Sequence, residues 1–357
     1  MSKTTVGLNI GSTSLKFVEL IHKRGKYKLS KIGVEEFPLS EKQGYMSQQS
    51  LIVKSIQKVI RSYRLNSKRI VTGVEGESVV VRTIRVPKMK KRELEEAIRW
   101  KAEEHIPYPA EDAFLGYHVL KRDLTAPTGT EMAVMVVGVR KDTIERYLDI
   151  FRQANLCPAI VDANSLALYN IFEKINRERE KNIAVINIGH KITNFVIVAE
   201  GSPFLVRDIK FGGESVTQGL IRALGVNYSQ AENIKKACSL TGMSKKEKIE
   251  AKLSEEEMNQ ILYSALEDLI KEIVHSFEYF TSNKEGGVVQ KIVISGGTSL
   301  IKNIDKIISS ELGIPVQRMT PFSDVIYQKG KSEDVFVRSS PLFAVATGLA
   351  LREISLI

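Results

Sequence analysis

Apolar and polar residues alternate near the start of the chain in a way that is typical of extended strands. Apolar side chains occupy every second position over residues 6–10, a turn of Gly11-Ser12-Thr13-Ser14 follows, and a second apolar run covers residues 15–20. This pattern predicts a β-hairpin closed by a glycine turn. A further alternating run predicts a third strand over residues 27–37.

The rest of the chain divides into short apolar runs, which predict buried strands, and longer segments with helical spacing. Strands are expected at 69–74, 79–86, 114–120, 132–139, 158–162 and 292–295. Helices are expected at 48–63, 93–105, 143–154, 165–175, 227–238, 255–280 and 342–351, and through Ile307 and Ile308. The alternating charges of residues 245–256 predict a solvated loop or an exposed helix.

Residues 184–198 repeat the form of residues 6–20, with a strand, a glycine turn and a second strand. Both copies place Asn-Ile-Gly at the turn. Such a repeat predicts two structurally related halves that face each other across a cleft. The alternative is two unrelated hairpins that share a common turn residue.

Residues 79–157 follow a different order of strand, helix, strand, strand and helix. This order indicates a small domain inserted into the first half. The same block carries five basic residues and no acid from Arg85 to Arg92. We therefore expect a strongly basic surface on the inserted domain.

Composition narrows the class of protein. A length of 357 residues predicts about two compact domains, and 43% hydrophobic with 26% charged residues is ordinary for a globular protein. No apolar run approaches the ~18 residues that span a bilayer, and no signal-peptide core is present, so we expect a cytosolic protein. The two cysteines, Cys157 and Cys238, have neither disulfide nor zinc-site spacing. The net charge of +10 indicates an acidic partner, a membrane surface or nucleic acid.

Three glycine turns each follow a predicted buried strand. They are Gly11-Ser12-Thr13-Ser14, Gly189-His190-Lys191-Ile192-Thr193 and Gly296-Gly297-Thr298. Glycine lets the backbone approach a ligand closely, and N–H groups and hydroxyls donate to phosphate oxygens. None is a Walker P-loop or a dinucleotide fingerprint, and each alone is more often structural. Their order and spacing together predict a nucleotide cleft between the two halves.

These motifs resemble those of the actin-like ATPase superfamily, and within it the PilM family of type IV pilus assembly proteins, which is related to FtsA. The first phosphate motif resembles the run from Asn9 to Lys16, the second resembles the run from Asn187 to Thr193, and the adenosine motif resembles residues 294–300. The segment 97–109, with its Ile-Pro-Tyr-Pro ending, is similar to the PilM family in particular. Segments 136–140, 161–168 and 343–351 extend the likeness over almost the whole chain. FtsA also carries an amphipathic membrane tail, which this sequence does not show after its last apolar helix.

The resemblance implies an α/β fold, namely the actin-like, ribonuclease-H-like duplicated two-domain fold with an inserted small subdomain of the FtsA/PilM type. It implies the following division of the chain: subdomain 1A over 1–81, 158–180 and 336–357, inserted subdomain 1C over 82–157, subdomain 2A over 181–225 and 261–335, and subdomain 2B over 226–260.

The resemblance also implies a binding site for ATP or ADP. Its residues would be Gly11, Ser12, Thr13, Ser14, Lys16, Gly189, Lys191, Thr193, Glu232, Lys235, Gly296, Gly297 and Thr298. Glu232 and Lys235 would approach the ribose and adenine. A solvated helix face is the alternative for these two residues.

Three asparagines stand where the superfamily commonly has acids. Asn9 and Asn187 replace aspartates of the two phosphate motifs, and Asn164 replaces a glutamate that positions the attacking water. Asparagine binds Mg²⁺ weakly and cannot act as a base. Loss of one positioned base typically costs ~10²–10⁴ in rate, so we expect hydrolysis to be weak or absent, with Mg²⁺ held weakly and no protein metal ligands. Asp162 is the nearby carboxylate, either recruited for this role or structural.

By the same resemblance, the protein is expected to be a nucleotide-binding scaffold of a type IV pilus or a related secretion or competence machine. It would lie at the inner face of the cell membrane and bind the N-terminal cytoplasmic tail of a PilN-like membrane protein. Pilus motor ATPases and further copies of the chain are additional expected partners. The alternatives are an active actin-fold ATPase or kinase, or an FtsA-like filament-forming division protein. Nucleic acid is not expected because no aromatic-interleaved basic motif occurs, so the basic run 85–92 would face anionic lipid or an acidic partner.

Overall fold

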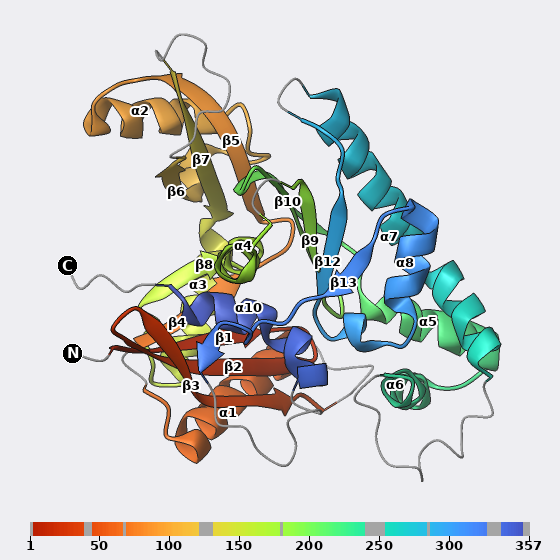
Figure 1. The fold of residues 1–357 in the computed structure, drawn as a ribbon. Coiled ribbons are helices and arrows are strands. Elements are labelled where there is room, and N and C mark those ends of the chain that lie inside the picture. Colours follow the sequence, from red (N-terminus) through yellow and green to blue (C-terminus); the bar gives the residue numbers. More distant parts are fainter. Residues whose placement is uncertain are drawn as a thin grey trace.

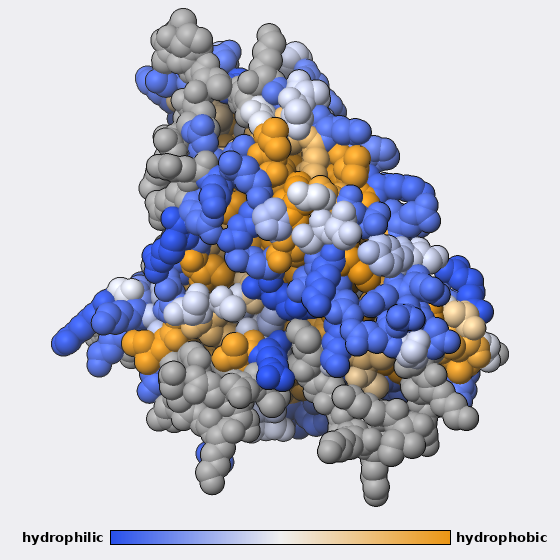
Figure 2. Space-filling view, turned by 45° about the vertical axis from the view of Figure 1, so that its right-hand side comes forward, coloured by the Kyte–Doolittle hydropathy of each residue, from blue (hydrophilic) through white to orange (hydrophobic). Residues whose placement is uncertain are grey.

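The computed structural model describes residues 3–38, 45–66, 69–120, 131–178, 181–239, 254–283, 286–326 and 337–352. Its strands form two large sheets and one small sheet, with helices packed between and around them (Figure 1). The apolar residues on the face drawn in Figure 2 gather mainly in the upper half of the view, with hydrophilic residues around them.

The first large sheet has the strand order β14-β3-β2-β1-β4-β8. Its strands are β1 (Lys3–Ile10), β2 (Ser14–Lys23), β3 (Lys26–Glu36), β4 (Ile70–Val74), β8 (Ile160–Ala163) and β14 (Val325–Ile326). β1, β2 and β3 are antiparallel, whereas β4 is parallel to β1 and β8 is parallel to β4. The predicted first hairpin is confirmed, and the Gly11 N–H donates to the Ser14 carbonyl at 3.0 Å to close its turn.

The second large sheet repeats this topology in the order β11-β10-β9-β12-β13. Its strands are β9 (Ile183–Ile188), β10 (Thr193–Ala199), β11 (Ser202–Ile209), β12 (Lys291–Ser295) and β13 (Val316–Arg318). Three antiparallel strands are again followed by two parallel ones. The Gly189 N–H donates to the Ile192 carbonyl at 3.0 Å, as in the first hairpin. The predicted duplication is therefore confirmed, and the alternative of two unrelated hairpins is wrong.

The small sheet has the order β5-β7-β6 and is antiparallel throughout. It consists of β5 (Val79–Pro87), β6 (Ala113–Val119) and β7 (Glu131–Arg140), with the 3-10 turn η2 (Ala110–Asp112) before β6. Helix α2 (Lys91–Ala102) covers one face of it and buries Leu94 and Ile98 against the sheet. α2 begins two residues before the predicted helix 93–105 and ends three residues before its end. Glu93 explains the early start, because its carboxylate accepts the Lys90 N–H and caps the first turn.

Four helices surround the first large sheet. α1 (Tyr45–Tyr63) and α3 (Lys141–Gln153) pack on one face, where Phe151 joins the same hydrophobic cluster as Leu8 and Phe17. α4 (Asn164–Ile175) and α10 (Ala344–Ala350) cover the other face, and α4 also packs against the second large sheet (Figure 1). Helix α3 lies within residues 82–157, which were assigned to the inserted subdomain, yet it packs on the first large sheet. The boundaries 82–157 therefore stay a prediction.

Two glycines let α10 contact its neighbours backbone to backbone. A Cβ on Gly348 of α10 would lie 1.8 Å from the Ala167 carbonyl oxygen of α4. A Cβ on Gly7 of β1 would lie 2.0 Å from the Ala346 carbonyl oxygen of α10. Side chains larger than hydrogen therefore cannot be accommodated at either position without moving the helix. The short turn η5 (Ser340–Phe343) leads into α10, so the predicted helix 342–351 begins later than expected.

The second large sheet is covered by α5 (Gly213–Leu224), α6 (Tyr228–Ala237), α7 (Glu255–Ser282) and α8 (Ile304–Leu312). The long helix predicted at 255–280 is confirmed, and it buries its apolar stripe against the sheet. Strand β11 and helix α5 were not predicted from the sequence. Residues 245–253 lie outside the described residues. None of the helices in the described ranges combines the length and apolar character needed to cross a bilayer.

Candidate functional site

The glycine turn of the second hairpin, the start of α5 and the segment after β12 are in direct contact. The Gly189 carbonyl accepts the Gly213 N–H at 2.9 Å and the Thr298 hydroxyl at 2.7 Å. A Cβ on Gly213 would lie 2.5 Å from the Thr298 hydroxyl oxygen, so a larger residue at the start of α5 would displace the Thr298 side chain. Two of the three predicted glycine motifs therefore form one structural unit at the carboxyl ends of β9 and β12.

Gly296 allows these two strand ends to approach each other closely. Its φ angle is +87°, a conformation that favours glycine, and a Cβ there would lie 2.4 Å from the Ile188 carbonyl oxygen. The same Cβ would lie 3.0 Å from Oδ1 of Asn187. The backbone after β12 therefore passes against the second hairpin with no room for a side chain. Gly297, the next residue, is exposed.

The first hairpin places a lysine over its own turn. Lys16 lies opposite Asn9 on the neighbouring strand, and its Nζ atom would be 3.1 Å from a Cβ on Gly11. Burial lowers the pKa of Lys16 to about 8, although Glu75 and Glu36 act in the opposite direction. The nearby carboxylates of Glu75 and Glu36 therefore only partly offset the cost of burying the Lys16 ammonium.

The remaining predicted residues of the two hairpins differ in their surroundings. Ser12 and Thr13 are partly exposed in the first turn, whereas Ser14 is buried at the start of β2. The Thr193 hydroxyl is fully buried and donates to the Phe211 carbonyl at 2.9 Å. Lys191 is exposed, and its Nζ lies 3.9 Å from Oε1 of Glu214. The structure therefore leaves the partly exposed hydroxyls of the first turn and the Lys191 ammonium facing solvent, but not the Thr193 hydroxyl.

Glu232 and Lys235 are buried, so the alternative of a solvated helix face is wrong. Both lie on α6, where Lys235 forms an ion pair with Glu232. Nζ of Lys235 also donates to the Gly213 carbonyl at 3.0 Å and to the Thr217 hydroxyl at 2.7 Å. Burial lowers the pKa of Lys235, and the Glu232 carboxylate opposes this shift. The pair therefore stands beside Gly213 and Thr298, the same unit that the glycine motifs form.

The pKa of His190, in the second turn, depends on charged groups from both halves. Burial lowers its pKa to about 4, and the positive charges of Lys235, Lys191 and Lys16 contribute in the same direction. Its Nε2 atom lies 3.0 Å from the Tyr228 hydroxyl. His190 is therefore neutral near neutral pH, in a site that already contains several cations.

Two of the three asparagines at the predicted acidic positions are engaged inside the protein. Nδ2 of Asn187 donates to Oδ1 of Asn194 at 2.9 Å, and its Oδ1 accepts the Ser295 hydroxyl at 3.4 Å. Nδ2 of Asn164 donates to Oε2 of Glu75 at 2.7 Å. Oδ1 of Asn164 has no hydrogen-bond partner and lies against Gly73, where a Cβ would be 2.1 Å away. Asn9 is partly exposed on β1.

Two carboxylates that sequence reasoning missed complete this network. Glu75 follows β4 in the first half, and Asp208 belongs to β11 in the second half. Asn194 donates to Oδ1 of Asp208 at 2.9 Å and to Oε2 of Glu75 at 3.5 Å, while the Gly76 N–H donates to Oδ2 of Asp208 at 2.7 Å. Burial raises the pKa of both carboxyl groups, that of Asp208 to about 7. The network therefore connects the two halves through two buried carboxyl groups.

The sequence left two roles open for Asp162, recruited to the site or structural, and its contacts fit the structural role. Its Oδ2 lies 2.9 Å from Arg352, and its Oδ1 accepts the Ala163 N–H at 2.9 Å. Burial raises the pKa of Asp162, and the Arg352 charge opposes this shift. The carboxylate in contact with Asn164 is Glu75. The sequence offered one signal for it, because Glu75 directly follows a buried strand at the same end of the sheet as the glycine turns.

The donor set suits phosphate better than a metal ion. Lysine ammonium groups, hydroxyls and glycine-turn N–H groups all donate hydrogen bonds, and anions prefer such surroundings. In the parts of the chain that the structure describes, no cluster of three or more His, Cys, Asp or Glu side chains is arranged to hold a metal ion.

Two duplicated sheets with glycine hairpins at their facing ends define an actin-like ATPase fold. The family model described as type IV pilus assembly protein PilM matches residues 7–354, and the chain belongs to this family. A solved structure described as the PilM-PilN type IV pilus biogenesis complex is similar over 99% of this chain and 99% of that chain, with 25% sequence identity and a TM-score of 0.81.

More distant structures share the fold alone. The ethanolamine utilization protein EutJ from Carboxydothermus hydrogenoformans is 13% identical, with 98% of this chain and 89% of that chain covered and a TM-score of 0.56. MreB5 of Spiroplasma citri, bound to AMPPNP, is also 13% identical, with 97% and 94% covered and a TM-score of 0.53. These likenesses agree with the fold class expected from the glycine motifs.

Proposed function

We propose that this protein is a nucleotide-binding scaffold of a type IV pilus or a related secretion or competence machine, with weak or absent hydrolysis. The observation that carries the proposal is the contact of the Gly189 turn with Thr298 and the start of α5, opposite a first turn that holds Lys16. Neither half has an acid at the motif positions, which are Asn9 and Asn187. The arrangement is suited to binding phosphates and is poorly equipped to cleave them.

ATP or ADP would bind with its phosphates between the two hairpin turns. The backbone of Gly11, Ser12, Thr13 and Ser14, the Lys16 ammonium and the turn from Gly189 to Thr193 would surround the phosphates. The segment Gly296-Gly297-Thr298 and the buried pair Glu232 and Lys235 would lie toward the nucleoside. Mg²⁺ would enter with the nucleotide and be held weakly, because the amides of Asn9 and Asn187 carry no charge.

Glu75 favours a second candidate function, an active ATPase. It is a carboxylate near Lys16 and in contact with Asn164, where the superfamily places its water-positioning residue. However, the amides of Asn164 and Asn194 both donate to the Glu75 carboxylate, and no acid stands at Asn9 or Asn187 to hold Mg²⁺. We therefore place this function second. Phosphate release at ordinary enzyme rates, abolished by Asn9→Ala or Glu75→Gln, would reverse the order.

Binding of a fluorescent ATP analogue to the purified protein tests the first proposal. Lys16→Met should weaken binding by roughly 10–100-fold, since a charge-assisted hydrogen bond contributes ~1.5–3 kcal/mol. Lys306→Met removes an exposed lysine of α8 and is the matched control, which should bind as the wild type does. No detectable binding by the wild type, or equal binding by both variants, would overturn the proposal.

The proposed partner is the N-terminal cytoplasmic tail of a PilN-like membrane protein, through which the scaffold would lie at the inner face of the membrane. The full-length likeness to a PilM-PilN complex supports this part of the proposal. Contacts with pilus motor ATPases and with further copies of the chain would follow from the same role. Fluorescence anisotropy with a synthetic peptide of that tail tests it, with a scrambled peptide as control. Equal binding of both peptides, or binding of neither, would count against the scaffold function.

A further inference from the structure

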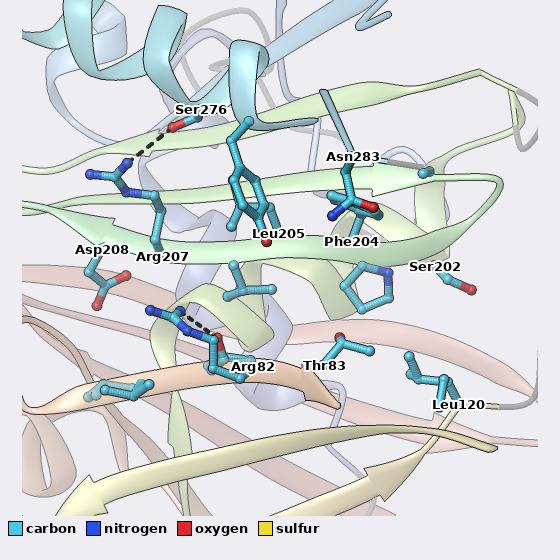
Figure 3. Close-up of a pocket in the computed structure, with 18 of the residues that line it drawn as sticks. Arg82, Thr83, Leu120, Ser202, Phe204, Leu205, Arg207, Asp208, Ser276 and Asn283 are labelled. Atoms are coloured by element: carbon cyan, nitrogen blue, oxygen red, sulfur yellow. Dashed lines mark hydrogen bonds between the residues drawn. The ribbon is translucent and has the colours of Figure 1, made fainter. Parts of the chain in front are cut away.

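A cavity of about 840 Å³ lies between the small sheet and the second large sheet, away from the glycine turns. One wall is β5, the opposite wall is β11, and the third side is α7 with His275 and Tyr279. Figure 3 shows Arg82 and Thr83 on one side of this space and Phe204 and Leu205 on the other. We refer to it as the β5–β11 groove.

The two walls are strand edges rather than sheet faces. Consecutive residues line the groove, namely 79–83 of β5 and 202–208 of β11, whereas a sheet face would present every second residue. β5 and β11 are each the outermost strand of their sheet, and no other strand of the described ranges pairs with these edges. An edge strand offers backbone N–H and C=O groups for a further strand. On β5 the Val81 and Arg85 carbonyls already accept from the Arg82 guanidinium and the Lys101 ammonium, so pairing would centre on Thr83, whose backbone groups point away from β7.

The two edges meet at one end and line a hollow further along. Val81 and Val206 belong to one hydrophobic cluster, and the Gly76 N–H donates to Asp208 at the same end. Thr83, Leu120 and Ser202 line the groove beyond this contact (Figure 3). An extended segment could enter from that end without displacing the contact between the halves.

β5 is the better template of the two edges. β11 contains Pro203, which lacks an N–H, and its pairing with β10 shifts register between Ile197 and Val198. Such features protect an edge from pairing. β5 instead pairs with β7 in one continuous register from Val79 to Pro87.

The side chains of the groove indicate the chemistry of its occupant. Arg82 is exposed, and its guanidinium donates to the neighbouring Val81 carbonyl at 2.9 Å. Among the described residues, no carboxylate forms an ion pair with it. Arg207 of β11, by contrast, forms an ion pair with Glu272 of α7. Phe204, Leu205 and Tyr279 add apolar surface, and 55% of Tyr279 is exposed. A carboxylate beside apolar side chains would complement this surface.

We propose that the β5–β11 groove binds an extended acidic peptide segment of another protein. The segment would add to β5 as a fourth strand, place a carboxylate against Arg82 and pack apolar side chains toward Phe204 and Leu205. Backbone hydrogen bonds to a sheet edge provide affinity, and alternate side chains provide specificity. This surface is separate from the glycine turns, and the acidic segment would be a ligand additional to the nucleotide and the membrane-protein tail of the proposed function.

Selection of random phage-displayed peptides of about twelve residues tests the groove, because a strand of that length exceeds the β5 edge. Peptides enriched on the wild-type protein should combine acidic with alternating apolar residues. The best peptide should bind Arg82→Glu about tenfold or more weakly, since a charged pair is replaced by repulsion. Arg99→Glu makes the same charge change at an exposed position of α2 and should bind as the wild type does.

Amide hydrogen exchange gives a second readout that does not depend on a variant. The bound peptide should slow exchange of the Thr83 N–H by about tenfold or more, because this group points away from β7 and a new strand would protect it. Enrichment of no peptide, equal binding to Arg82→Glu and the wild type, or unchanged exchange in β5 would each overturn the proposal. Neither readout uses a nucleotide or the membrane partner, so these failures leave the proposed function untouched.

Discussion

Asn194 is the residue on which the polar connection between the two halves depends. Its side chain is fully buried, its Oδ1 accepts from Asn187 at 2.9 Å, and its Nδ2 donates to Asp208 at 2.9 Å. Asn194→Ala leaves a buried donor and a buried carboxylate oxygen without partners. Each unsatisfied buried group costs ~1–3 kcal/mol, so we expect the two together to lower the free energy of unfolding by ~2–6 kcal/mol.

The size of this loss should depend on pH. Burial raises the pKa of Asp208 from 3.8 to about 7, so between these values the folded protein holds a proton that the unfolded chain releases. The wild type therefore loses stability as pH rises through this range. The Asn194 hydrogen bond favours the ionised form of Asp208 and opposes the shift. Its removal should cost most above neutral pH, by ~1 kcal/mol more than below it, because hydrogen bonds to charged groups are the stronger ones.

Urea unfolding at about pH 5.5 and about pH 8.5 measures both effects. Thr72→Val is the matched control, because the Thr72 hydroxyl is equally buried and donates to the Leu8 carbonyl at 3.0 Å, which does not titrate. The control should cost ~1–3 kcal/mol at either pH. If Asn194→Ala costs the same at both pH values, or follows the control, the link between Asn194 and the ionisation of Asp208 is refuted.

Two further predictions concern cations. The pKa of Lys16 is lowered to about 8, so its positive charge is lost as pH rises above that value, and ATP-analogue affinity should fall about tenfold from about pH 7.5 to about pH 9.5. The Lys16→Met variant should show no such fall, and an identical fall would assign it to another group. Changing the exposed lysines Lys88, Lys90 and Lys91 together to Glu should weaken sedimentation with anionic vesicles by roughly 100-fold, at ~1 kcal/mol for each lysine lost. The triple change of Lys23, Lys26 and Lys28 to Glu, also exposed, is the control, and equal effects would mean that only net charge matters.

Local patterns predicted the elements whose periodicity is undisturbed. The first hairpin and helix α7 follow strict alternation and a continuous apolar stripe, and both are where the sequence placed them. Strand β11 was missed because Pro203 and the charged pair Arg207 and Asp208 interrupt its apolar pattern.

Helix α5 was missed for a different reason. It begins directly after Gly212, and two consecutive glycines usually indicate a loop. Here the glycine is required by packing, since a Cβ on Gly212 would lie 2.3 Å from the His190 carbonyl oxygen. Only the folded arrangement of the second hairpin against α5 explains this residue.

The candidate site shows the same division between local and distant information. Glycine turns after buried strands are local features, and the sequence placed all three of them. The contacts of Glu75 are not local, because its partners Asn164 and Asn194 lie 89 and 119 residues further along the chain. No spacing rule indicates such partners. The sequence could name only Asp162 as a nearby carboxylate, with its role left open, and Asp162 pairs with Arg352.

The close packing of α10 has a consequence for how the protein folds during synthesis. The helix lies against β1 and α4 of the first half, with Gly7 and Gly348 at the points of contact, yet it is made after every strand of the second half. When the ribosome has released residues 3–178, the six-stranded sheet still lacks this helix and the edge strand β14. The second large sheet and its helices, in contrast, form one continuous stretch from β9 to β13. The first half to be translated is therefore the last to complete its core.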